Sequence, residues 1–406
     1  FTPSGNDKDS TDMCNNYFWN GAIIELVCVS LIFLGCIMTC WLLKNEIKEL
    51  KKEIDDAIQN VLDNTAFILG DAVHNFEQEF AKEHNVKYCL GTSSGTDANH
   101  LVLWAAGIKT GDEVIIPANT FIATAWGATL CGATPVFVDC HPLSYNIDPE
   151  KIIAAITPRT KAIVAVHLYG QPADIDNLKQ IADKYNLLLV EDAAQAHFAE
   201  YNGKRIGSTT YATSFSFYPG KNLGAFGEGG AVVTNNDEVF RKVKLYREHG
   251  QSQKYYHETY GHNYRMEGIQ GAVLGVKLKH LDSWTEGRRK VAAKYRERLS
   301  SIEQLILPTE MLNVKHVYHL FVTRVNTGIN SSSNRDELQN YLKDNGIATG
   351  LHYPVPLHQQ KCFEHLGYKK GAFPVTENLA ETGISLPMFA ELSDQQIDYV
   401  CDKIRE

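Results

Sequence analysis

The chain has 406 residues, of which 44% are hydrophobic and 21% charged, and its formal net charge is -9 at pH 7. This composition excludes a mainly disordered protein. The negative charge argues against a protein that binds nucleic acid through its phosphates, because such binding needs a basic surface. The nine cysteines include no C-x-x-C pair, so reduced thiols of a cytoplasmic protein are expected rather than a disulfide scaffold or a metal site.

The first feature along the chain is an apolar stretch. Residues 19–43 contain a single charged residue and are long enough for a transmembrane helix, with Trp19 and Trp41 near the ends as interfacial anchors. Several lysines follow from Lys44 onward, and this bias places the rest of the chain in the cytoplasm. We therefore expect residues 1–43 to tether the rest of the chain, on its cytoplasmic side, to a membrane. The alternative is a segment foreign to the rest of the chain.

The next part of the chain alternates between helices and short apolar strands. Apolar residues at helical spacing predict helices over Lys48–Leu62 and Asp71–His84. Further helices are predicted over Thr96–Ala106, Thr120–Cys131 and Asp174–Tyr185. Seven strands are predicted at Lys87–Leu90, Glu113–Ile116, Thr134–Val138, Ala162–Val166, Leu187–Val190, Ala212–Phe217 and Ala231–Thr234. The alternation indicates an α/β fold with a mostly parallel seven-stranded sheet, in which ligands bind beyond the carboxyl ends of the strands.

The pattern changes after Ser283. A charged helix, a strand, a helix, a proline-rich loop and a final helix predict a smaller α+β domain; they cover Glu286–Leu299, His319–Val325, Arg335–Asn345, 352–358 and Ser393–Ile404. Three regions are expected: an N-terminal segment over residues 1–43, a large α/β domain over 44–285 and the small C-terminal domain over 286–406.

The first candidate motif is the sequence GTSSG at Gly91–Gly95, between a predicted strand and a predicted helix. It matches the G-x-S-x-G nucleophile elbow, so a serine hydrolase using Ser93, a later aspartate and His352 or His358 is one hypothesis. Small residues before a helix N-terminus are also typical of a phosphate-binding loop. A simple tight turn is the third interpretation. The motif alone does not decide between them.

The second motif is LLLVEDAAQAH at residues 187–197, where a buried strand ends in Glu191 and Asp192. Asp192 could be the N-cap of a helix, or it could be a carboxylate that faces a cationic partner in a site. The third motif, at residues 214–234, places Lys221 in a turn after a buried strand and before four glycines. Lysines in turns are usually solvated, but small and aromatic neighbours would desolvate this one and lower its pKa, which makes the amine a usable nucleophile.

The three motifs together match what pyridoxal 5′-phosphate (PLP) requires. A loop holds the phosphate, an aspartate pairs with the pyridinium nitrogen, and a lysine forms the covalent link to the cofactor. A hydrolase has no use for Lys221 and Asp192 at these places.

The sequence at this point resembles the DegT/DnrJ/StrS family of sugar-nucleotide aminotransferases. The resemblance runs from about Leu50 to the C-terminus and rests on blocks in family order. These blocks include GTSSGTDANHL, GDEVIIPANTFIATA, VEDAAQAH, SFSFYPGKNLGAFGEGGAVVT, NYRMEGIQGAVLGVKL and HYPVPLH. It implies the PLP-dependent transferase fold type I, the fold of aspartate aminotransferase. Residues 1–43 have no counterpart in the usual family pattern.

The resemblance also implies roles for single residues. Lys221 is similar to the cofactor-linking lysine and Asp192 to the partner of the ring nitrogen. The remaining cofactor contacts that it implies are Gln195 at the ring hydroxyl, Phe121 on the ring face, and Gly95, Thr96 and Ser216 at the phosphate. Asn263 is similar to an asparagine that reaches the phosphate from the neighbouring subunit, which implies a homodimer with shared sites. Arg265, His352 and Tyr353 are candidate contacts of the sugar nucleotide, although turn rigidity or a surface ion pair would explain them equally well.

The activity implied by the resemblance is transamination from glutamate to a keto group of a nucleotide-linked deoxyhexose. The blocks at Lys221 and at residues 352–358 look most like those of enzymes that aminate a dTDP-3-keto-6-deoxyhexose. A 4-keto or a UDP-linked sugar is the nearest alternative. A serine hydrolase and a non-catalytic PLP-binding regulator are the alternatives from other classes.

Overall fold

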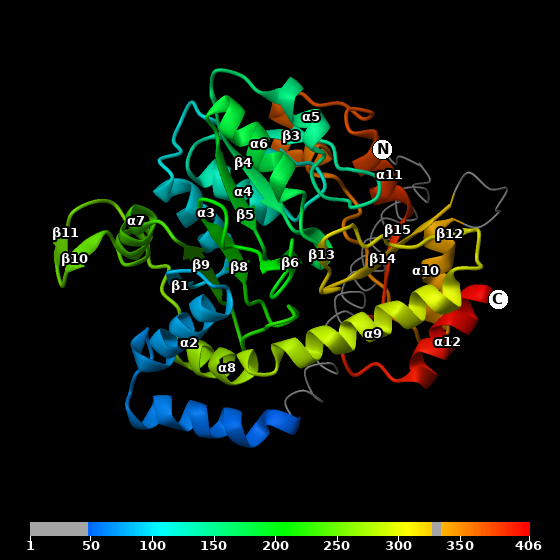
Figure 1. Cartoon of the computed structure of the whole chain (residues 1–406), viewed down its shortest axis with the longest axis horizontal. Coiled ribbons are helices and arrows are strands. Elements are labelled where there is room, and N and C mark those ends of the chain that lie inside the picture. Colours follow the sequence, from blue (N-terminus) through cyan, green and yellow to red (C-terminus); the bar gives the residue numbers. More distant parts are fainter. Residues whose placement is uncertain (1–47, 327–333) are drawn as a thin grey trace, which may run out of the picture. The chain divides into compact units, whose positions relative to one another are not determined.

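The computed structural model describes residues 48–326 and 334–406 (Figure 1). The predicted membrane anchor lies outside these ranges and stays a prediction. Within them, none of the helices combines the length and the apolar character that crossing a membrane would need.

A seven-stranded sheet forms the centre of the described part, in the order β1-β9-β8-β5-β4-β2-β3. Four neighbouring pairs, from β8 to β3 across the sheet, are parallel, whereas β9 runs antiparallel to both β1 and β8. The strands are β1 (Tyr88–Thr92), β2 (Glu113–Pro117), β3 (Thr134–Val138), β4 (Thr160–Val166), β5 (Leu188–Asp192), β8 (Thr213–Ser216) and β9 (Gly230–Thr234). Each lies at one of the seven predicted positions, and the mostly parallel sheet is confirmed.

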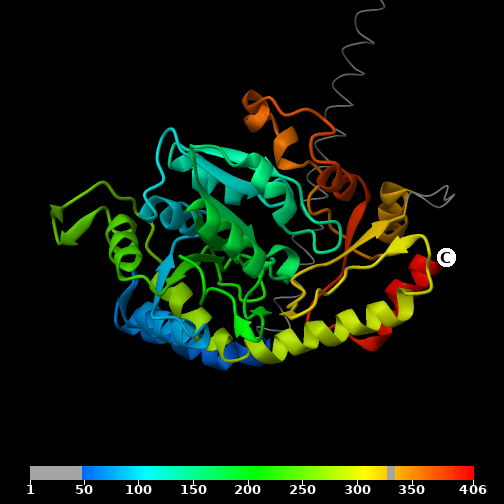
Figure 2. The same cartoon turned by 45° about the horizontal axis from the view of Figure 1, so that its top comes forward.

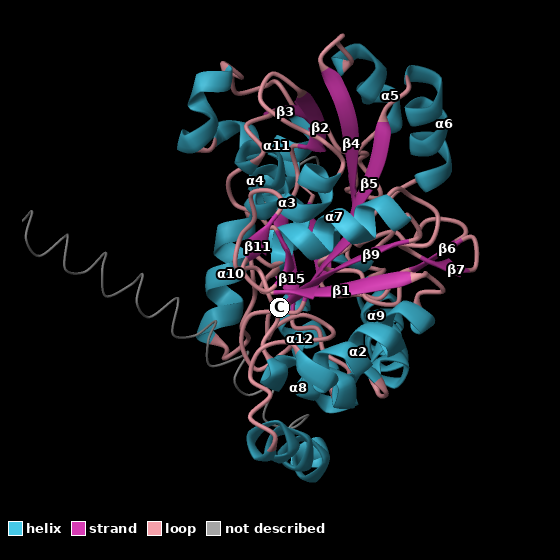
Figure 3. Ribbon diagram, turned by 90° about the vertical axis from the view of Figure 1, so that its left-hand side faces the viewer, coloured by secondary structure: helices cyan, strands magenta, loops and turns pink. Residues whose placement is uncertain are grey.

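Helices cover both faces of this sheet, as Figure 3 shows. One face packs against α3 (Gly95–Ala105), α4 (Ile122–Leu130) and α7 (Asp237–Arg247). The other face packs against α6 (Ile175–Tyr185) over β4 and β5, and against α2 (Gly70–Glu83), which in turn contacts α8 (Gly268–Leu278). Alternate residues of a strand serve the two faces: Val114 and Ile116 join the first cluster, and Ile115 joins the second. Strands buried on both faces explain why the sequence shows them as continuous apolar runs.

The C-terminal part contains a separate antiparallel sheet, β12-β14-β15. Its strands are β12 (Leu305–Ile306), β14 (Phe321–Val325) and β15 (Gly383–Leu386), and the helices of this part are α10 (Arg335–Asp344), α11 (Pro374–Thr382) and α12 (Asp394–Arg405). The predicted α+β character is therefore observed.

The long helix α9 (Leu281–Leu299) joins the two sheets (Figure 2). Near its start, Leu281 belongs to the apolar cluster of the large sheet. Near its end, the ring of Tyr295 packs against that of Phe321 on β14, with the ring centroids 5.1 Å apart. The boundary expected between residues 285 and 286 falls inside this continuous helix.

Several elements had not been predicted, among them α7, α8 and a hairpin of β10 (Gln251–Gln253) and β11 (Tyr256–His257), which projects beyond α7 (Figures 1 and 2). The predicted first helix is observed over residues 48–63. The remaining elements are α5 (Pro149–Ile152), β6 (Glu200–Tyr201), β7 (Lys204–Arg205), β13 (Val314–Lys315) and the short 3-10 helices Ile153–Ala155, Leu168–Gly170, Leu357–Gln359 and Lys361–Leu366.

A cluster of aromatic rings joins α2 to the sheet beneath it. Phe80 is fully buried and meets Phe76, Phe215 and Phe217, the last two edge-on, with ring centroids 5.0 to 5.5 Å apart. Edge-to-face packing of this kind stabilises a core beyond the burial of apolar area. Phe215 and Phe217 flank Ser216, so this cluster also supports the end of β8.

Phe80→Ala should lower the free energy of unfolding by about 3–5 kcal/mol, because it removes a buried ring and leaves a cavity. Urea denaturation followed by circular dichroism measures the loss. Phe67, which is 47% exposed, offers the matched control Phe67→Ala, for which a much smaller loss is expected. Equal losses for the two variants would contradict the central place of this cluster in the core.

Candidate active site

Asp192 is the last residue of β5, at the carboxyl edge of the parallel strands. Its side chain is buried, and its Oδ2 accepts hydrogen bonds from Asn99 Nδ2 at 2.9 Å and Thr124 Oγ1 at 2.7 Å. Its Oδ1 accepts one from the backbone N–H of Ala194 at 3.1 Å. The residues that follow Asp192 form turns and not a helix, so the helix N-cap interpretation is wrong, and the buried carboxylate remains.

Lys221 lies in the turn that follows β8, where its backbone N–H donates to the Tyr218 carbonyl at 2.8 Å. Burial lowers the pKa of its amine from the ordinary value of 10.5 to about 8, against the opposing effect of the nearby Asp192 carboxylate. This is the direction that the sequence predicts for a lysine among small and aromatic neighbours. Asp192 and Lys221 approach from two neighbouring strands, since β5 pairs with β8.

The loop Gly91–Gly95 is packed tightly between β8, β9 and the start of α3. A side-chain carbon on Gly95 would lie 2.5 Å from the Cβ of Ser216, so only glycine fits there. Ser94 caps α3 by accepting from the Asp97 N–H at 3.1 Å. The glycine lets the loop approach Ser216 closely, and the first N–H groups of α3 provide donors for an anion. Gly95 thus lies against Ser216, with Thr96 beside it, and the role of these three residues as phosphate contacts stays a prediction.

A buried ion pair holds the beginning of this loop. Arg247 Nη1 contacts both Glu77 Oε1 and the Gly91 carbonyl at 2.8 Å, and the Gly91 N–H donates to the same Glu77 oxygen at 2.7 Å. Arg247 is 4% exposed. The two charges therefore fix both backbone polar groups of Gly91 from α2 and α7.

The hydrolase hypothesis fails at Ser93. Its Oγ donates to the Asp97 carboxylate at 2.6 Å rather than to an imidazole. The two candidate histidines have other partners, because His352 Nδ1 bonds Ser385 Oγ at 2.9 Å and His358 Nε2 bonds Glu377 at 2.9 Å. The nucleophile and base that such an enzyme needs are therefore not paired in the described part of the chain.

The loop at residues 352–358 meets the end of β5 through Gln195. Gln195 Nε2 donates to the Tyr353 hydroxyl at 3.0 Å, and its Oε1 accepts from the Tyr169 N–H at 2.6 Å. The ring of Phe121, 53% exposed, lies 5.7 Å from the Tyr353 ring. Phe121, Gln195 and Tyr353 are thus brought together.

His352 belongs to the same region. Its carbonyl accepts a hydrogen bond from the Tyr169 hydroxyl. Burial, and secondarily the charge of Lys221, lower the pKa of His352 to about 4. This shift favours the neutral imidazole near pH 7 in the ligand-free chain, and the predicted role of His352 as a sugar-nucleotide contact stays a prediction.

Asn263 and Arg265 lie in a segment that runs beside the phosphate loop Gly91–Gly95. Asn263 is exposed and accepts a hydrogen bond from Arg265 Nε at 3.0 Å. The carbonyl of Tyr264, between them, accepts from the Ser93 N–H at 2.9 Å. Both residues thus border the phosphate loop, and their predicted roles toward a partner subunit and a sugar nucleotide remain predictions.

Four polar residues of this region were missed from the sequence: Asn99, Thr124, His197 and His319. The first two bond Asp192, and burial followed by the charge of Lys221 lowers the pKa of both histidines, to about 3 for His197. A signal was present, because Asn99 and Thr124 are buried polar residues on helices whose other buried positions are mostly apolar.

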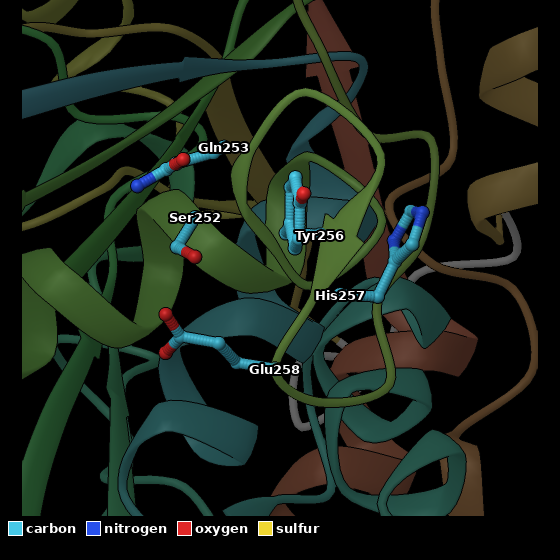
Figure 4. A pocket seen from close by; sticks show the side chains of 5 residues that line it. All are labelled: Ser252, Gln253, Tyr256, His257 and Glu258. Atoms are coloured by element: carbon cyan, nitrogen blue, oxygen red, sulfur yellow. The ribbon is translucent and has the colours of Figure 1, made fainter.

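A hollow of about 500 Å³ lies in the projecting β10–β11 hairpin (Figure 4). It is lined by Ser252, Gln253, Tyr256, His257 and Glu258. The hairpin stands beside α7 at one margin of the sheet, whereas Asp192 ends a central strand. The hollow is therefore separate from the chemical groups described above.

Comparison with known proteins defines the class. Residues 48–405 match the model of the DegT/DnrJ/EryC1/StrS aminotransferase family. The chain belongs to this family of PLP-dependent aminotransferases, and it is an aminotransferase enzyme.

Individual relatives carry different names. The chain is 46% identical to a "Pleiotropic regulatory protein" of Geobacillus stearothermophilus, over 90% of this chain and 96% of that one. It is 43% identical to a dTDP-3-amino-3,4,6-trideoxy-alpha-D-glucose transaminase of Streptomyces venezuelae, over 90% and 94%. A UDP-N-acetyl-3-dehydro-alpha-D-glucosamine 3-aminotransferase of Acidithiobacillus ferrooxidans is 44% identical over 88% and 94%.

Solved structures agree on the fold. The structure of DesV from S. venezuelae in complex with a ketimine intermediate is 43% identical, with a TM-score of 0.86 over 89% of this chain and 96% of that one. The structure of NtdA from Bacillus subtilis with the bound cofactor PMP is 31% identical, with a TM-score of 0.79 over 88% and 81%. The transferase fold predicted from the sequence is confirmed.

The polar groups of the site fit PLP. In the described ranges Lys221 Nζ has no hydrogen bond or ion pair, and Asp192 has no cationic side chain in salt-bridge contact. A desolvated amine and a buried carboxylate that do not pair with each other suit an aldehyde and a protonated ring nitrogen.

Lys221→Met should stabilise the cofactor-free protein at pH 7. Because the folded state holds the Lys221 pKa near 8 instead of 10.5, it binds this proton less tightly than the unfolded chain does. The resulting destabilisation is complete below about pH 8 and disappears as the pH rises toward 10.5. The gain from the substitution, measured by urea denaturation, should shrink over that range.

The matched control is Lys179→Met on α6, because Lys179 is exposed and pairs with Asp183 at 3.2 Å. It should give no such gain. A gain at Lys221 that does not vary between pH 8 and 10.5 would contradict the desolvated amine.

Proposed function

We propose that the enzyme transfers an amino group from glutamate to a keto group of a nucleotide-linked deoxyhexose, specifically a dTDP-3-keto-6-deoxyhexose. The observation that carries the proposal is the Lys221 amine, which has no hydrogen-bond or ion-pair partner among the described residues and lies close to the buried Asp192 carboxylate. The names of the Streptomyces and Acidithiobacillus relatives, both of which place nitrogen at carbon 3, support the 3-keto position. Those names differ in the nucleotide, so UDP-linked and 4-keto sugars are the alternatives that the experiment must separate.

The residues that would hold PLP are Lys221, Asp192, Gln195, Phe121, Gly95, Thr96 and Ser216. Bound PLP supplies an electron-accepting ring conjugated to the nitrogen being transferred. Asp192 would face the ring nitrogen as an anion and favour its protonated form. Lys221 would take up and return a proton at Nζ, which a pKa of about 8 allows in both directions near neutral pH. Glutamate leaves as its keto acid, and the keto-sugar leaves as the amino-sugar.

A panel of dTDP- and UDP-linked 3-keto and 4-keto sugars, incubated with the protein, PLP and glutamate, tests the proposal. Mass spectrometry should show amination of the dTDP-3-keto-6-deoxyhexose in preference to the others. Lys221→Ala should abolish turnover, and Asp192→Asn should reduce it by about 10²-fold or more, as for other removed electrostatic partners of a reacting group.

The matched controls, Lys179→Ala and Asp183→Asn, change an exposed pair on α6 and should leave the rate unaltered. Turnover by Lys221→Ala would refute the role of that lysine. Binding of PLP without turnover of any sugar would favour a regulator, the alternative to which the name of the Geobacillus relative points.

We further propose that two chains form a dimer in which Asn263 of each chain completes the phosphate site of the other. Its exposure, next to the tyrosine-rich hairpin where Tyr255, Tyr256 and Tyr260 are 70–90% exposed, supports a contact surface there. The apolar segment 19–43 is proposed to tether this dimer to a membrane.

Light scattering should give twice the mass of one chain, and a monomer with full activity would refute the shared site. Mixed dimers test which chain supplies the asparagine. A dimer of one Lys221→Ala chain and one Asn263→Ala chain has one intact site if Asn263 acts across the interface, so activity should exceed the average of the two variants. If Asn263 acts within its own chain, neither site is intact and no gain appears.

A further inference from the structure

We propose that Asn99 and Thr124 are positioning residues that hold the Asp192 carboxylate ionised and in one orientation, each at the end of its own relay of hydrogen bonds. The inference rests on the proposed role of Asp192 toward the cofactor ring. The two relays are named here the threonine arm, Thr120 and Thr124, and the asparagine arm, Ser214 and Asn99.

The two arms converge on one oxygen atom. Asn99 on α3 and Thr124 on α4 donate to Asp192 Oδ2 at 2.9 and 2.7 Å. All three residues are at most 7% exposed. Hydrogen bonds from two helices to a strand-end carboxylate fix both its position and its rotation, because each donor has a restricted direction.

The direction of the threonine arm follows from counting protons. Thr124 has one hydroxyl proton, and it donates that proton to Asp192. The bond between Thr124 Oγ1 and Thr120 Oγ1, at 2.9 Å, must therefore take its proton from Thr120. The arm thus points from Thr120 through Thr124 to the carboxylate.

The asparagine arm has the same direction. If the Asn99 amide were turned over, its oxygen would face the Asp192 carboxylate, and two acceptors would meet in a buried place. The amide nitrogen therefore faces Asp192, and Asn99 Oδ1 is left to the Ser214 hydroxyl at 2.5 Å. Ser214 must be the donor in that bond, so this arm too ends on the carboxylate.

In every one of these contacts the Asp192 carboxylate accepts the hydrogen bond. Both arms donate to Oδ2, and Oδ1 receives the Ala194 N–H at 3.1 Å. Each of these donors binds an ionised carboxylate more strongly than a neutral carboxyl, because hydrogen bonds to a charged acceptor are the stronger ones. The arms therefore select the charged form that a protonated ring nitrogen requires, although neither Asn99 nor Thr124 needs to touch the cofactor.

Thr124→Val tests the inference, because valine has nearly the shape of threonine without the hydroxyl. We expect kcat to fall about tenfold, as for a lost hydrogen bond to a charged group, with the KM for glutamate nearly unchanged. The dissociation constant of PLP should rise, and the pH at which the absorbance band of the bound cofactor changes should shift. Thr124→Ser keeps the hydroxyl and should restore all of these values. Ser214→Ala, a smaller change in the other arm, should move them in the same direction.

Thr285→Val is the matched control. Thr285 is fully buried on α9, and its hydroxyl has no hydrogen-bond partner among the described residues. Its replacement should leave kcat, the PLP dissociation constant and the absorbance titration as they are. If Thr285→Val and Thr124→Val behaved alike, the effect would come from core packing, and the inference would be overturned.

A double-mutant cycle separates this inference from the proposed function. If Thr124 acts through Asp192, then Thr124→Val should cause little further loss of kcat in an Asp192→Asn background. A full additional loss would overturn the inference. Wild-type behaviour of Thr124→Val beside a severely impaired Asp192→Asn would also overturn it while leaving the proposed function intact. Wild-type turnover by Asp192→Asn would instead refute the proposed role of Asp192 and, with it, the inference.

Discussion

The site depends on two opposite charges that are close but not paired. Lys221 loses the solvation of its ammonium group, and Asp192 is buried with neutral donors only. A direct ion pair would lower the electrostatic free energy of the two charges, but it would leave no place for a cofactor between them. The fold maintains the separation by attaching the two residues to neighbouring strands, β5 and β8, whose pairing fixes where each chain segment leaves the sheet.

Much of the surrounding structure keeps this arrangement in place. The aromatic cluster under α2 supports the end of β8 from one side, and the Glu77–Arg247 pair holds Gly91 at the start of the phosphate loop. The close contact between Gly95 and Ser216 then places the N-terminus of α3 against β8. These contacts come from residues far apart in the chain, so the geometry of the site is a property of the whole α/β unit.

The strands, the position of Asp192 and the desolvation of Lys221 could be predicted from the sequence, because strands buried on both faces appear as continuous apolar runs and ligand sites follow their carboxyl ends. Asn99 and Thr124 could be recognised from the sequence only as polar residues on buried helix faces, because helical spacing shows that a side chain faces inward but not which strand end it meets. Helix α7 was missed because its exposed face is rich in charge, with only Val239, Val243 and Arg247 buried. The β10–β11 hairpin has too few apolar residues for an alternating pattern.

The continuous helix α9 determines where the chain can be cut or recombined. Its first turn belongs to the core of the large sheet and its last turns to that of the small one, with the Tyr295 hydroxyl bound to the Pro387 carbonyl at 2.9 Å. Cutting the polypeptide within α9 would leave one of the two sheets without the part of the helix that packs on it. The two sheets are therefore not separable modules, and recombination or circular permutation should succeed at outer loops but not at the junction that composition alone suggests.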